Sequence, residues 1–528
     1  MFFHHPRVLR TPRRCLKMGK TLKIVSIFSF FVFVFYFLKD INLPFVGPFG
    51  NNNSTYSIQA KNYIKIGLER TRLAPVNKIE DGKFQYYLHH PPLLQLLTAL
   101  SFKVFGQNFW WPGRFFPIIA ALFSIILMTA IAKKLFGEIE GWFTLFFAST
   151  SPFLFSFGKI IQFEPFLLCI TLLFIYIIVH KSSQKTTGWL IFLSIIGCLI
   201  DWTMILFLLS LYFIYRNFSL NRNAIKTCLA VGFAVLVLFF IYASFLVGPK
   251  EIISAYIGRN FGKELFGQHW AVLKLISLLL LRIIIYFTPL SFAAAIYLLL
   301  KRKMDKVSLV FLVFGGSNVL LFLNGAYAHP YWLYYLTPFF LFSSVSLTKK
   351  LLDQKKWPWL GIVLLITNAA FSALVIKYKD QQIKKALWQN EFIDQIMPLL
   401  KPDEEIGVSW DFNEELLRYK TGHPVTILWS KKEIFKNTLE KPKWHYFIFS
   451  CWANCNPEDA KIGETLLEKY DLALKEKENR AFLFDLTEPS KGQPKEIYGK
   501  KSKVEKGNTL LPLLYYRKAR DFLGVNQI

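Results

Sequence analysis

The sequence predicts a mainly α-helical protein that crosses a membrane about eleven times, with a large first loop and a small α/β domain on the external side. The chain of 528 residues is 53% hydrophobic and 17% aromatic, and only 19% of its residues are charged. A soluble protein of this length carries more charge, so the composition indicates a membrane protein. Apolar stretches recur throughout residues 22–376, whereas residues 377–487 alternate short apolar runs with helical patterns.

The predicted spans are apolar stretches long enough, or nearly so, to cross about 30 Å of hydrocarbon. The region 187–215 counts as two spans only if the chain turns at Asp201 and Trp202. The expected spans lie near residues 22–38, 115–133, 140–157, 164–180, 187–201, 202–215, 226–247, 272–300, 307–325, 331–347 and 357–376.

The basic residues in the short loops predict the orientation, because cytoplasmic loops carry an excess of lysine and arginine. Residues 1–21 form a basic leader, and no small-residue cleavage signal follows the first span, so we expect an uncleaved anchor with its N-terminus in the cytoplasm. The same orientation places five further basic clusters on the cytoplasmic side, at residues 132–134, 181–185, 216–226, 301–303 and 349–356.

Three segments are then external. The first loop, residues 39–114, is large, and residues 248–270 could form an amphipathic helix in the interface. In the third segment, residues 377–487, apolar runs alternate with helical patterns around 412–420, 431–439 and 457–470, which predicts strand–helix–strand units; a basic tail, residues 488–528, follows. The expected strands are residues 406–410, 425–428 and 446–449.

The formal net charge of +28 could suggest a nucleic-acid partner. However, the basic residues are spread between the spans and in the tail, without a dense stripe that includes exposed aromatic residues. We therefore expect the charge to serve topology and contact with anionic lipid head groups, and we expect no nucleic-acid partner. Cys451 and Cys455 are both predicted to be external and could form a disulfide, whereas no set of His and Cys residues has metal-ligand spacing.

Two carboxylates on separate predicted helices, Glu164 and Asp201, are expected at the same outer boundary. A carboxylate at the edge of a span costs free energy, which suggests a function. Cations can hold a phosphate while a carboxylate accepts a proton, so this pattern suits a reaction on a phosphorylated lipid. The external loops supply His89, His90, Arg114, Lys159, Lys250, Arg259 and His329.

Each of these residues also has a structural explanation. Arg114 and Lys159 could extend to lipid head groups. Glu164 could cap its own helix, which is compatible with catalysis. Asp201 could only end a helix and bind loop amides. Residues 52–55 contain overlapping glycosylation-type sequons, although we expect an asparagine-rich turn there.

Several motifs in residues 50–340 together resemble the polytopic GT-C glycosyltransferases of the family-39 type, which include the protein O-mannosyltransferases and the bacterial lipid A aminoarabinose transferases. The most specific motif is H-P-P-L at 90–93, followed by a short helix that ends in F-G. The other motifs are N-S-T-Y-S-I-Q-A-K-N-Y-I-K-I-G-L (53–68), S-P-F-L-F-S-F-G-K-I-I-Q-F-E-P (151–165), L-I-D-W-T (199–203) and A-H-P-Y-W-L-Y-Y-L-T-P (328–338).

The resemblance implies a catalytic body over residues 22–376 whose first external loop folds into a platform with interfacial helices. It also implies an enzyme that takes a sugar from a polyprenyl phosphate on the external side of the bacterial plasma membrane and transfers it with inversion. The implied partners are a polyprenyl-phosphate sugar, membrane lipid and a glycan, lipid or protein acceptor. A divalent metal ion could assist the phosphate, although no cofactor is certain.

The motifs also imply roles for particular residues. Glu164 matches the family's acidic position at the start of the fourth span, and Lys159 matches a basic position just before it. The catalytic candidates are Glu164 and Asp40. The candidates for binding the donor phosphate are His89, His90, Arg114, Lys159, Arg259 and His329. The candidates for positioning the substrate are Asn52, Tyr56, Asp201 and Tyr331.

The chain departs from the family in the first loop, where an acidic residue usually follows the first span. Here Gly50, Asn51, Asn52 and Asn53 occupy that stretch, and none of them accepts a proton usefully. Either Asp40 or Glu164 is then the base, or the chain has lost the reaction. Two alternatives therefore stay open: a non-catalytic relative that binds a lipid-linked glycan or a partner enzyme, and a transporter of lipid-linked sugars, although matching halves and Gly/Pro-broken spans are not evident.

Overall fold

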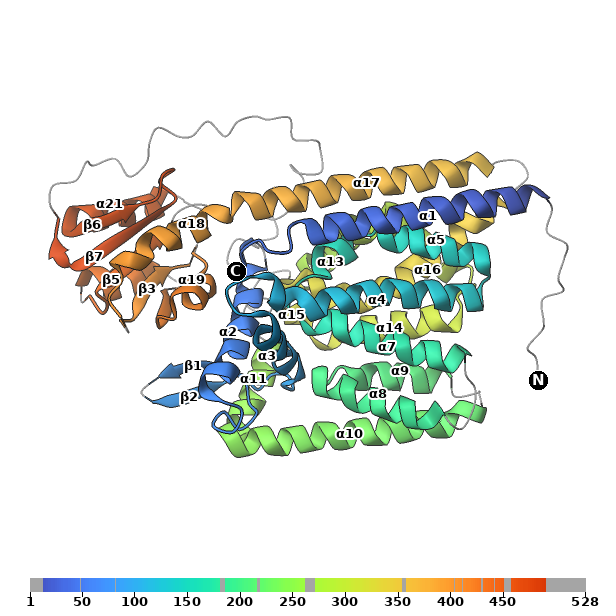
Figure 1. Ribbon diagram of the computed structural model, residues 1–528, viewed down its shortest axis with the longest axis horizontal. Coiled ribbons are helices and arrows are strands. Elements are labelled where there is room, and N and C mark those ends of the chain that lie inside the picture. The colour runs from blue at the N-terminus through green and yellow to red at the C-terminus, as the bar shows by residue number, and fades with distance from the viewer. Residues whose placement is uncertain are drawn as a thin grey trace. The chain divides into compact units, whose positions relative to one another are not determined.

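The computed structural model describes two compact units (Figure 1). The helical unit comprises the chain up to Ile41, Tyr87–Gly106 and Trp111–Lys379, and the α/β unit comprises Asn42–Tyr86, Gln107–Trp110 and the chain from Asp380. The described residues are 13–490 except 48, 81, 181–185, 216–218, 262–270, 354–357, 403, 411, 429–430, 441 and 451–456. Cys451 and Cys455 lie outside them.

The helical unit contains most of the chain's apolar residues. Six of its described helices are long and apolar enough to cross a membrane, and further shorter helices are apolar as well. Its elements are α1 (Arg13–Lys39), α3 (Leu93–Phe105), α4 (Trp111–Leu135), α5 (Glu138–Ser149), α6 (Pro152–Phe157), α7 (Phe163–His180), α8 (Thr187–Ile200), α9 (Met204–Ile214), α10 (Ser219–Val247), α11 (Pro249–Phe261), α13 (Ala271–Leu300), α14 (Lys306–Leu321), α15 (Leu323–Ala328), the 3-10 helix η2 (Pro330–Leu336), α16 (Thr337–Leu352) and α17 (Pro358–Lys385), which continues into the α/β unit.

Some predicted spans differ from the observed helices. The prediction of one helix over 140–157 is wrong, because the chain breaks between α5 and α6, where Ser151 caps α6 and Pro152 starts it. The expected span 331–347 begins as the 3-10 helix η2 rather than as an α-helix. The turn expected at Asp201 is confirmed, since α8 ends at Ile200 and α9 begins at Met204.

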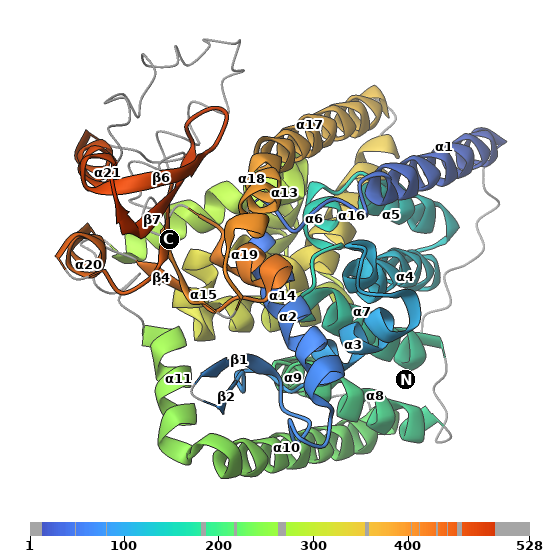
Figure 2. The same ribbon diagram turned by 60° about the vertical axis from the view of Figure 1, so that its left-hand side comes forward.

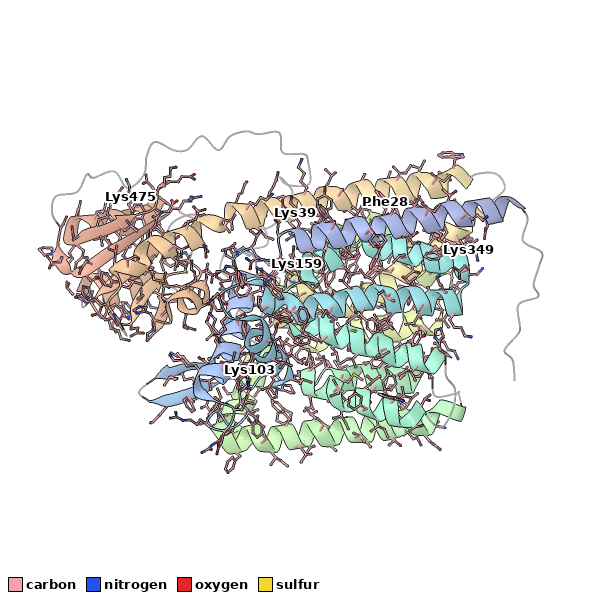
Figure 3. The ribbon with its side chains drawn as sticks, viewed as in Figure 1. Phe28, Lys39, Lys103, Lys159, Lys349 and Lys475 are labelled. Atoms are coloured by element: carbon pink, nitrogen blue, oxygen red, sulfur yellow. The ribbon has the colours of Figure 1, made fainter. Side chains whose placement is uncertain are left out.

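The long helices of the helical unit pack side by side, with α4 between α5 and α7 (Figures 1 and 2). Helix α1 packs against α5, α10 packs against α8 and α9, and α13 packs against α16. Lys39, Lys103 and Lys159 lie at one end of this bundle, and Lys349 lies at the other end, where α1 begins (Figure 3). This arrangement matches the predicted separation of Lys159 from the basic cluster that includes Lys349.

The α/β unit contains a five-stranded sheet in the order β4-β3-β5-β7-β6. Strands β4 (Val425–Leu428), β3 (Ile406–Ser409) and β5 (Tyr446–Ser450) are parallel and confirm the three predicted strands. Strands β6 (Tyr470–Lys475) and β7 (Ala481–Pro489) add an antiparallel edge that was not predicted. Helices α18 (Leu387–Ile396), α19 (Glu414–Thr421), α20 (Lys431–Ile434) and α21 (Pro457–Lys469) complete this part of the unit.

The first loop contributes α2 (Gly50–Ile66) and the hairpin β1 (Val76–Glu80) and β2 (Lys83–Tyr86) to the same unit. The expectation of a turn at residues 52–55 is wrong, because these residues form the first turns of α2. Helix α2 packs against α19. The Lys61 ammonium lies 3.6 Å from the centre of the Tyr419 ring, and burial lowers the pKa of Lys61 to about 8.

Gly50 allows the close approach between α2 and its neighbours in this unit. A Cβ atom at this position would overlap the Phe45 carbonyl oxygen and lie 2.7 Å from Asn413 Nδ2. Replacing Gly50 with alanine should therefore destabilise the α/β unit by about 1–3 kcal/mol, which thermal unfolding would measure. Gly188→Ala is the control, because its Cβ would meet nothing within 4 Å. Equal melting temperatures for the two variants would contradict the prediction.

Glu414 gives the α/β unit a specific pH dependence. Burial, reinforced by the neighbouring Glu415, raises the pKa of Glu414 to about 7. Between the ordinary glutamate pKa and 7 the folded state binds more protons than the unfolded state, so this group's contribution to stability falls as pH rises. We expect Glu414→Gln to lose less thermal stability than the wild type between pH 5 and pH 8. The control is Glu391→Gln, at an exposed residue of α18. If the melting temperatures of the wild type and Glu414→Gln changed in parallel with pH, this contribution of Glu414 would be excluded.

Candidate functional site

Glu164 lies in the first turn of α7, followed by Pro165, as the sequence predicted. Its side chain is buried, with 7% of the residue exposed. Helix α7 packs against the 3-10 helix η2, which contains Tyr334 and Tyr335. Because helix α7 packs against η2, the start of α7 and the motif at residues 328–338 form one region of the helical unit.

Asp201 ends helix α8 and is the centre of a buried hydrogen-bond network. Its Oδ1 accepts from the Thr203 backbone N–H (3.1 Å), and its Oδ2 accepts from the Thr203 hydroxyl (2.8 Å). These bonds confirm the structural explanation, in which Asp201 ends a helix and binds a loop amide. Two contacts go beyond it: His90 Nδ1 lies 3.4 Å from Asp201 Oδ1, and the Tyr335 hydroxyl donates to Oδ2 at 3.4 Å.

His90 connects this network to the start of α7. Its ring stacks on Phe163, the first residue of α7, with a centroid distance of 4.1 Å and an interplanar angle of 23°. Phe163 directly precedes Glu164 in the chain. The structure therefore brings His90, in the turn before α3, beside Asp201 in the α8–α9 turn, and it stacks His90 on the residue that precedes Glu164 at the start of α7.

The other predicted residues of the helical unit have separate contacts. Arg114 is buried, and its Nη1 donates to the Ile41 carbonyl oxygen (2.6 Å), so its side chain has a partner within the helical unit. The Lys159 ammonium lies 5.1 Å from the Phe155 ring centre and 5.8 Å from that of Phe37. Asp40 follows α1 and makes no hydrogen bond or ion pair with any described residue.

The remaining predicted residues lie in four other places. His89 meets the Tyr87 ring edge-on, and His329, at the end of α15, stacks on Tyr331 with a centroid distance of 5.0 Å. Arg259 belongs to α11. Asn52 and Tyr56 belong to α2 in the α/β unit.

A metal ion has no dedicated ligand set in the described residues. Among them, no group of three or more His, Cys, Asp and Glu side chains is placed to hold one.

Sequence reasoning missed Tyr335 and Thr203, which bind Asp201, and Phe163, which supports His90. All three lie inside or beside the quoted motifs, so their positions could have been noted. Only Thr203 had a local signal, since a hydroxyl two residues after an aspartate often binds its carboxylate in a turn.

Comparison with known proteins supports the fold. The family model for dolichyl-phosphate-mannose-protein mannosyltransferase matches residues 89–247, a span that contains His90, Glu164 and Asp201. No curated protein sequence matches the chain significantly.

The chain resembles solved structures over most of its length. ArnT from Cupriavidus metallidurans bound to undecaprenyl phosphate has a TM-score of 0.53 and 12% identity, covering 93% of this chain and 100% of that one. The archaeal oligosaccharyltransferase AglB from Archaeoglobus fulgidus, in complex with an inhibitory peptide and a dolichol-phosphate, has a TM-score of 0.52 and 11% identity, covering 84% of this chain and 72% of that one. The chain therefore has the GT-C fold of these solved structures, and its long apolar helices make it an integral membrane protein.

Proposed function

We propose that the protein is a membrane glycosyltransferase that moves a sugar from a polyprenyl-phosphate donor to an acceptor hydroxyl, with inversion. The observation that carries the proposal is the buried pair of His90 and Asp201, with His90 stacked on the residue before the buried Glu164, in a helical unit of GT-C fold. Buried ionisable residues at the ends of membrane helices cost free energy, so they usually mark a functional site. The solved relatives with bound undecaprenyl phosphate and dolichol-phosphate favour a lipid-phosphate donor.

The reaction needs a base for the acceptor and positive neighbours for the leaving group. The acceptor oxygen attacks the anomeric carbon while the bond from that carbon to the phosphate oxygen breaks, and the polyprenyl phosphate leaves with the bonding electrons. Glu164 is the proposed base that takes the acceptor proton. Lys159, His89, His329 and Arg259 are proposed to stabilise the departing phosphate.

Asp201 is proposed to orient His90 rather than to take the proton itself. Both of its carboxylate oxygens already accept hydrogen bonds within the protein, from Thr203 and Tyr335. A carboxylate that binds one ring nitrogen of a histidine fixes its ring orientation and leaves the other nitrogen for a ligand. In its doubly protonated form, His90 donates Nδ1–H to Asp201 and presents Nε2–H as a donor to an oxygen of the donor phosphate.

The assay uses the full chain in liposomes that contain undecaprenyl-phosphate sugars, with a cell-envelope extract as the source of acceptors. We expect release of undecaprenyl phosphate from at least one hexose or pentose donor and transfer of a labelled sugar to the extract. Release from no donor of the panel would contradict the proposal. Analysis by mass of surface glycans in a deletion strain would identify the product.

We place the reaction on the external side of the bacterial plasma membrane, because the predicted cytoplasmic loops carry the basic clusters. The same orientation makes the α/β unit external. A tag inserted in the loop after β6 should then be accessible to protease in intact spheroplasts, whereas a tag at the N-terminus should be protected. The reverse pattern would exclude this orientation.

A non-catalytic relative is the second candidate, and one observation favours it. The first turn of α2 contains no acidic residue, although the family usually carries one in this loop. In the same liposomes such a protein would bind the lipid-linked sugar and release no polyprenyl phosphate.

A further inference from the structure

Arg282 is a buried cation in a helix long enough to span the membrane. It lies in α13, and only 6% of the residue is exposed. An arginine in such a helix is costly and usually binds a specific partner. Here its Nη1 donates to the Ala326 carbonyl oxygen (2.5 Å) and its Nη2 donates to the Tyr327 carbonyl oxygen (2.9 Å).

These two carbonyl groups belong to the last turn of the six-residue helix α15. The last carbonyl groups of a helix lack partners within the helix, and a cation there is favourable. The preceding carbonyl, of Gly325, accepts from the His329 N–H at 2.9 Å. Arg282 therefore fixes the end of α15 at the point where the chain continues into η2.

The segment from α15 through η2, residues 323–336, is here called the α15–η2 arm. Asn318 Nδ2 in α14 donates to the Trp332 carbonyl oxygen (3.1 Å) in the middle of the arm. Near its end, Tyr335 stacks on Phe314 with a centroid distance of 4.4 Å and donates to Asp201. Arg282 is thus the first of several contacts along the arm, and Asp201 is the contact that belongs to the candidate site.

We propose that Arg282 is a positioning residue that holds the α15–η2 arm so that Tyr335 donates to Asp201. By this route it keeps the Asp201–His90 pair in place without touching the substrate. The effect of Arg282 on catalysis rests on the proposed function, whereas its effect on the arm does not. The competing explanation is that Arg282 binds the lipid phosphate directly, and the two differ in their expected kinetics.

The first test measures the arm itself by hydrogen–deuterium exchange in detergent or nanodiscs. Arg282→Met replaces arginine with another long, unbranched side chain that cannot donate either hydrogen bond. Amide exchange should therefore become faster in residues 323–336 and remain unchanged in α7. The control is Lys301→Met, which removes a cation directly after α13. Unchanged exchange in the arm would overturn the proposal, whether or not the protein transfers sugar.

The second test measures catalysis in the liposome assay with Arg282→Met, Arg282→Lys and Tyr335→Phe. Displacing a catalytic group slightly lowers kcat by about 10- to 100-fold, and we expect this for Arg282→Met with KM for the donor changed less than about twofold. Arg282→Lys should recover part of kcat, because an ammonium can donate to one of the two carbonyl groups.

A double mutant separates positioning from an independent role. If Arg282 acts through Tyr335, Arg282→Met combined with Tyr335→Phe should be no slower than the slower single mutant. If the double mutant lowered kcat by the product of the two single-mutant factors, the proposal would be overturned in favour of a direct role. A large rise in KM with kcat unchanged in Arg282→Met would have the same meaning. If the wild type releases no polyprenyl phosphate, the proposed function fails, and the exchange experiment still decides the role of Arg282.

Discussion

Glu164→Gln is expected to lower the rate of polyprenyl phosphate release by about a thousandfold, because glutamine has nearly the same shape as glutamate but cannot accept the acceptor proton. Glutamine fills the same volume as glutamate at this buried position in the first turn of α7, so the fold should persist. Binding of undecaprenyl phosphate should be retained, since the proton transfer concerns the acceptor. The measurements are release in the liposome assay and retention of fluorescent lipid phosphate by the purified variant.

Glu138→Gln is the matched control for Glu164→Gln. Glu138 lies in the first turn of α5 as Glu164 lies in the first turn of α7, but its side chain is largely exposed and pairs with Lys133 at 3.0 Å. It should therefore retain the wild-type rate. Asp40→Asn tests the alternative that Asp40 is the base. If Asp40→Asn greatly lowered the rate of polyprenyl phosphate release and Glu164→Gln lowered it little, Asp40 would be the base.

Asp201→Asn is expected to disturb both stability and activity. The oxygen of the asparagine side chain can still accept a hydrogen bond from Thr203. The NH2 group of the asparagine replaces the other carboxylate oxygen, and because it is a donor it cannot accept a hydrogen bond from Tyr335 or His90, whichever it faces. An unsatisfied buried polar group costs about 1–3 kcal/mol, so the melting temperature should fall. The loss of His90 orientation should lower the transfer rate by about 10- to 100-fold.

An exposed aspartate provides the comparison for Asp201→Asn. Asp353 follows helix α16 and is exposed, so Asp353→Asn should change neither melting temperature nor rate. The network would have no functional role if Asp201→Asn transferred sugar at the wild-type rate despite a lower melting temperature. A combination with His90→Gln should add little to the loss of rate, because the two residues act as a pair.

Local patterns predicted the helices and three of the five strands in the C-terminal sheet. Apolar runs predicted α4, α7 and α10, because a span must be continuously apolar along its whole length. The runs at β3, β4 and β5 were recognisable because their strands are mostly buried. Strand β6 was missed because it alternates buried and exposed residues irregularly and directly follows a helix. Strand β7 was missed although it begins with a buried apolar run like those of β3 and β5.

The candidate site was predicted only in part. Glu164, His90 and Asp201 were recognised because ionisable residues beside apolar spans are conspicuous. Arg114 had the same signal but binds the Ile41 carbonyl group, and Arg282 was overlooked although it lies within a predicted span. A charge pattern shows that an ionisable residue is present, but it does not show which partner the residue binds.

The sequence by itself determined that the chain is a helical membrane protein with an α/β domain, because composition and the length of apolar runs control whether a segment enters a bilayer. Only the tertiary structure decided that Tyr335 binds Asp201 across 134 residues, and that residues 42–86 of the first loop join the compact unit of the C-terminal domain. The physical reason is that such contacts depend on how helices pack against one another. That packing is decided by the shapes of side chains from distant segments and not by the pattern within any one of them.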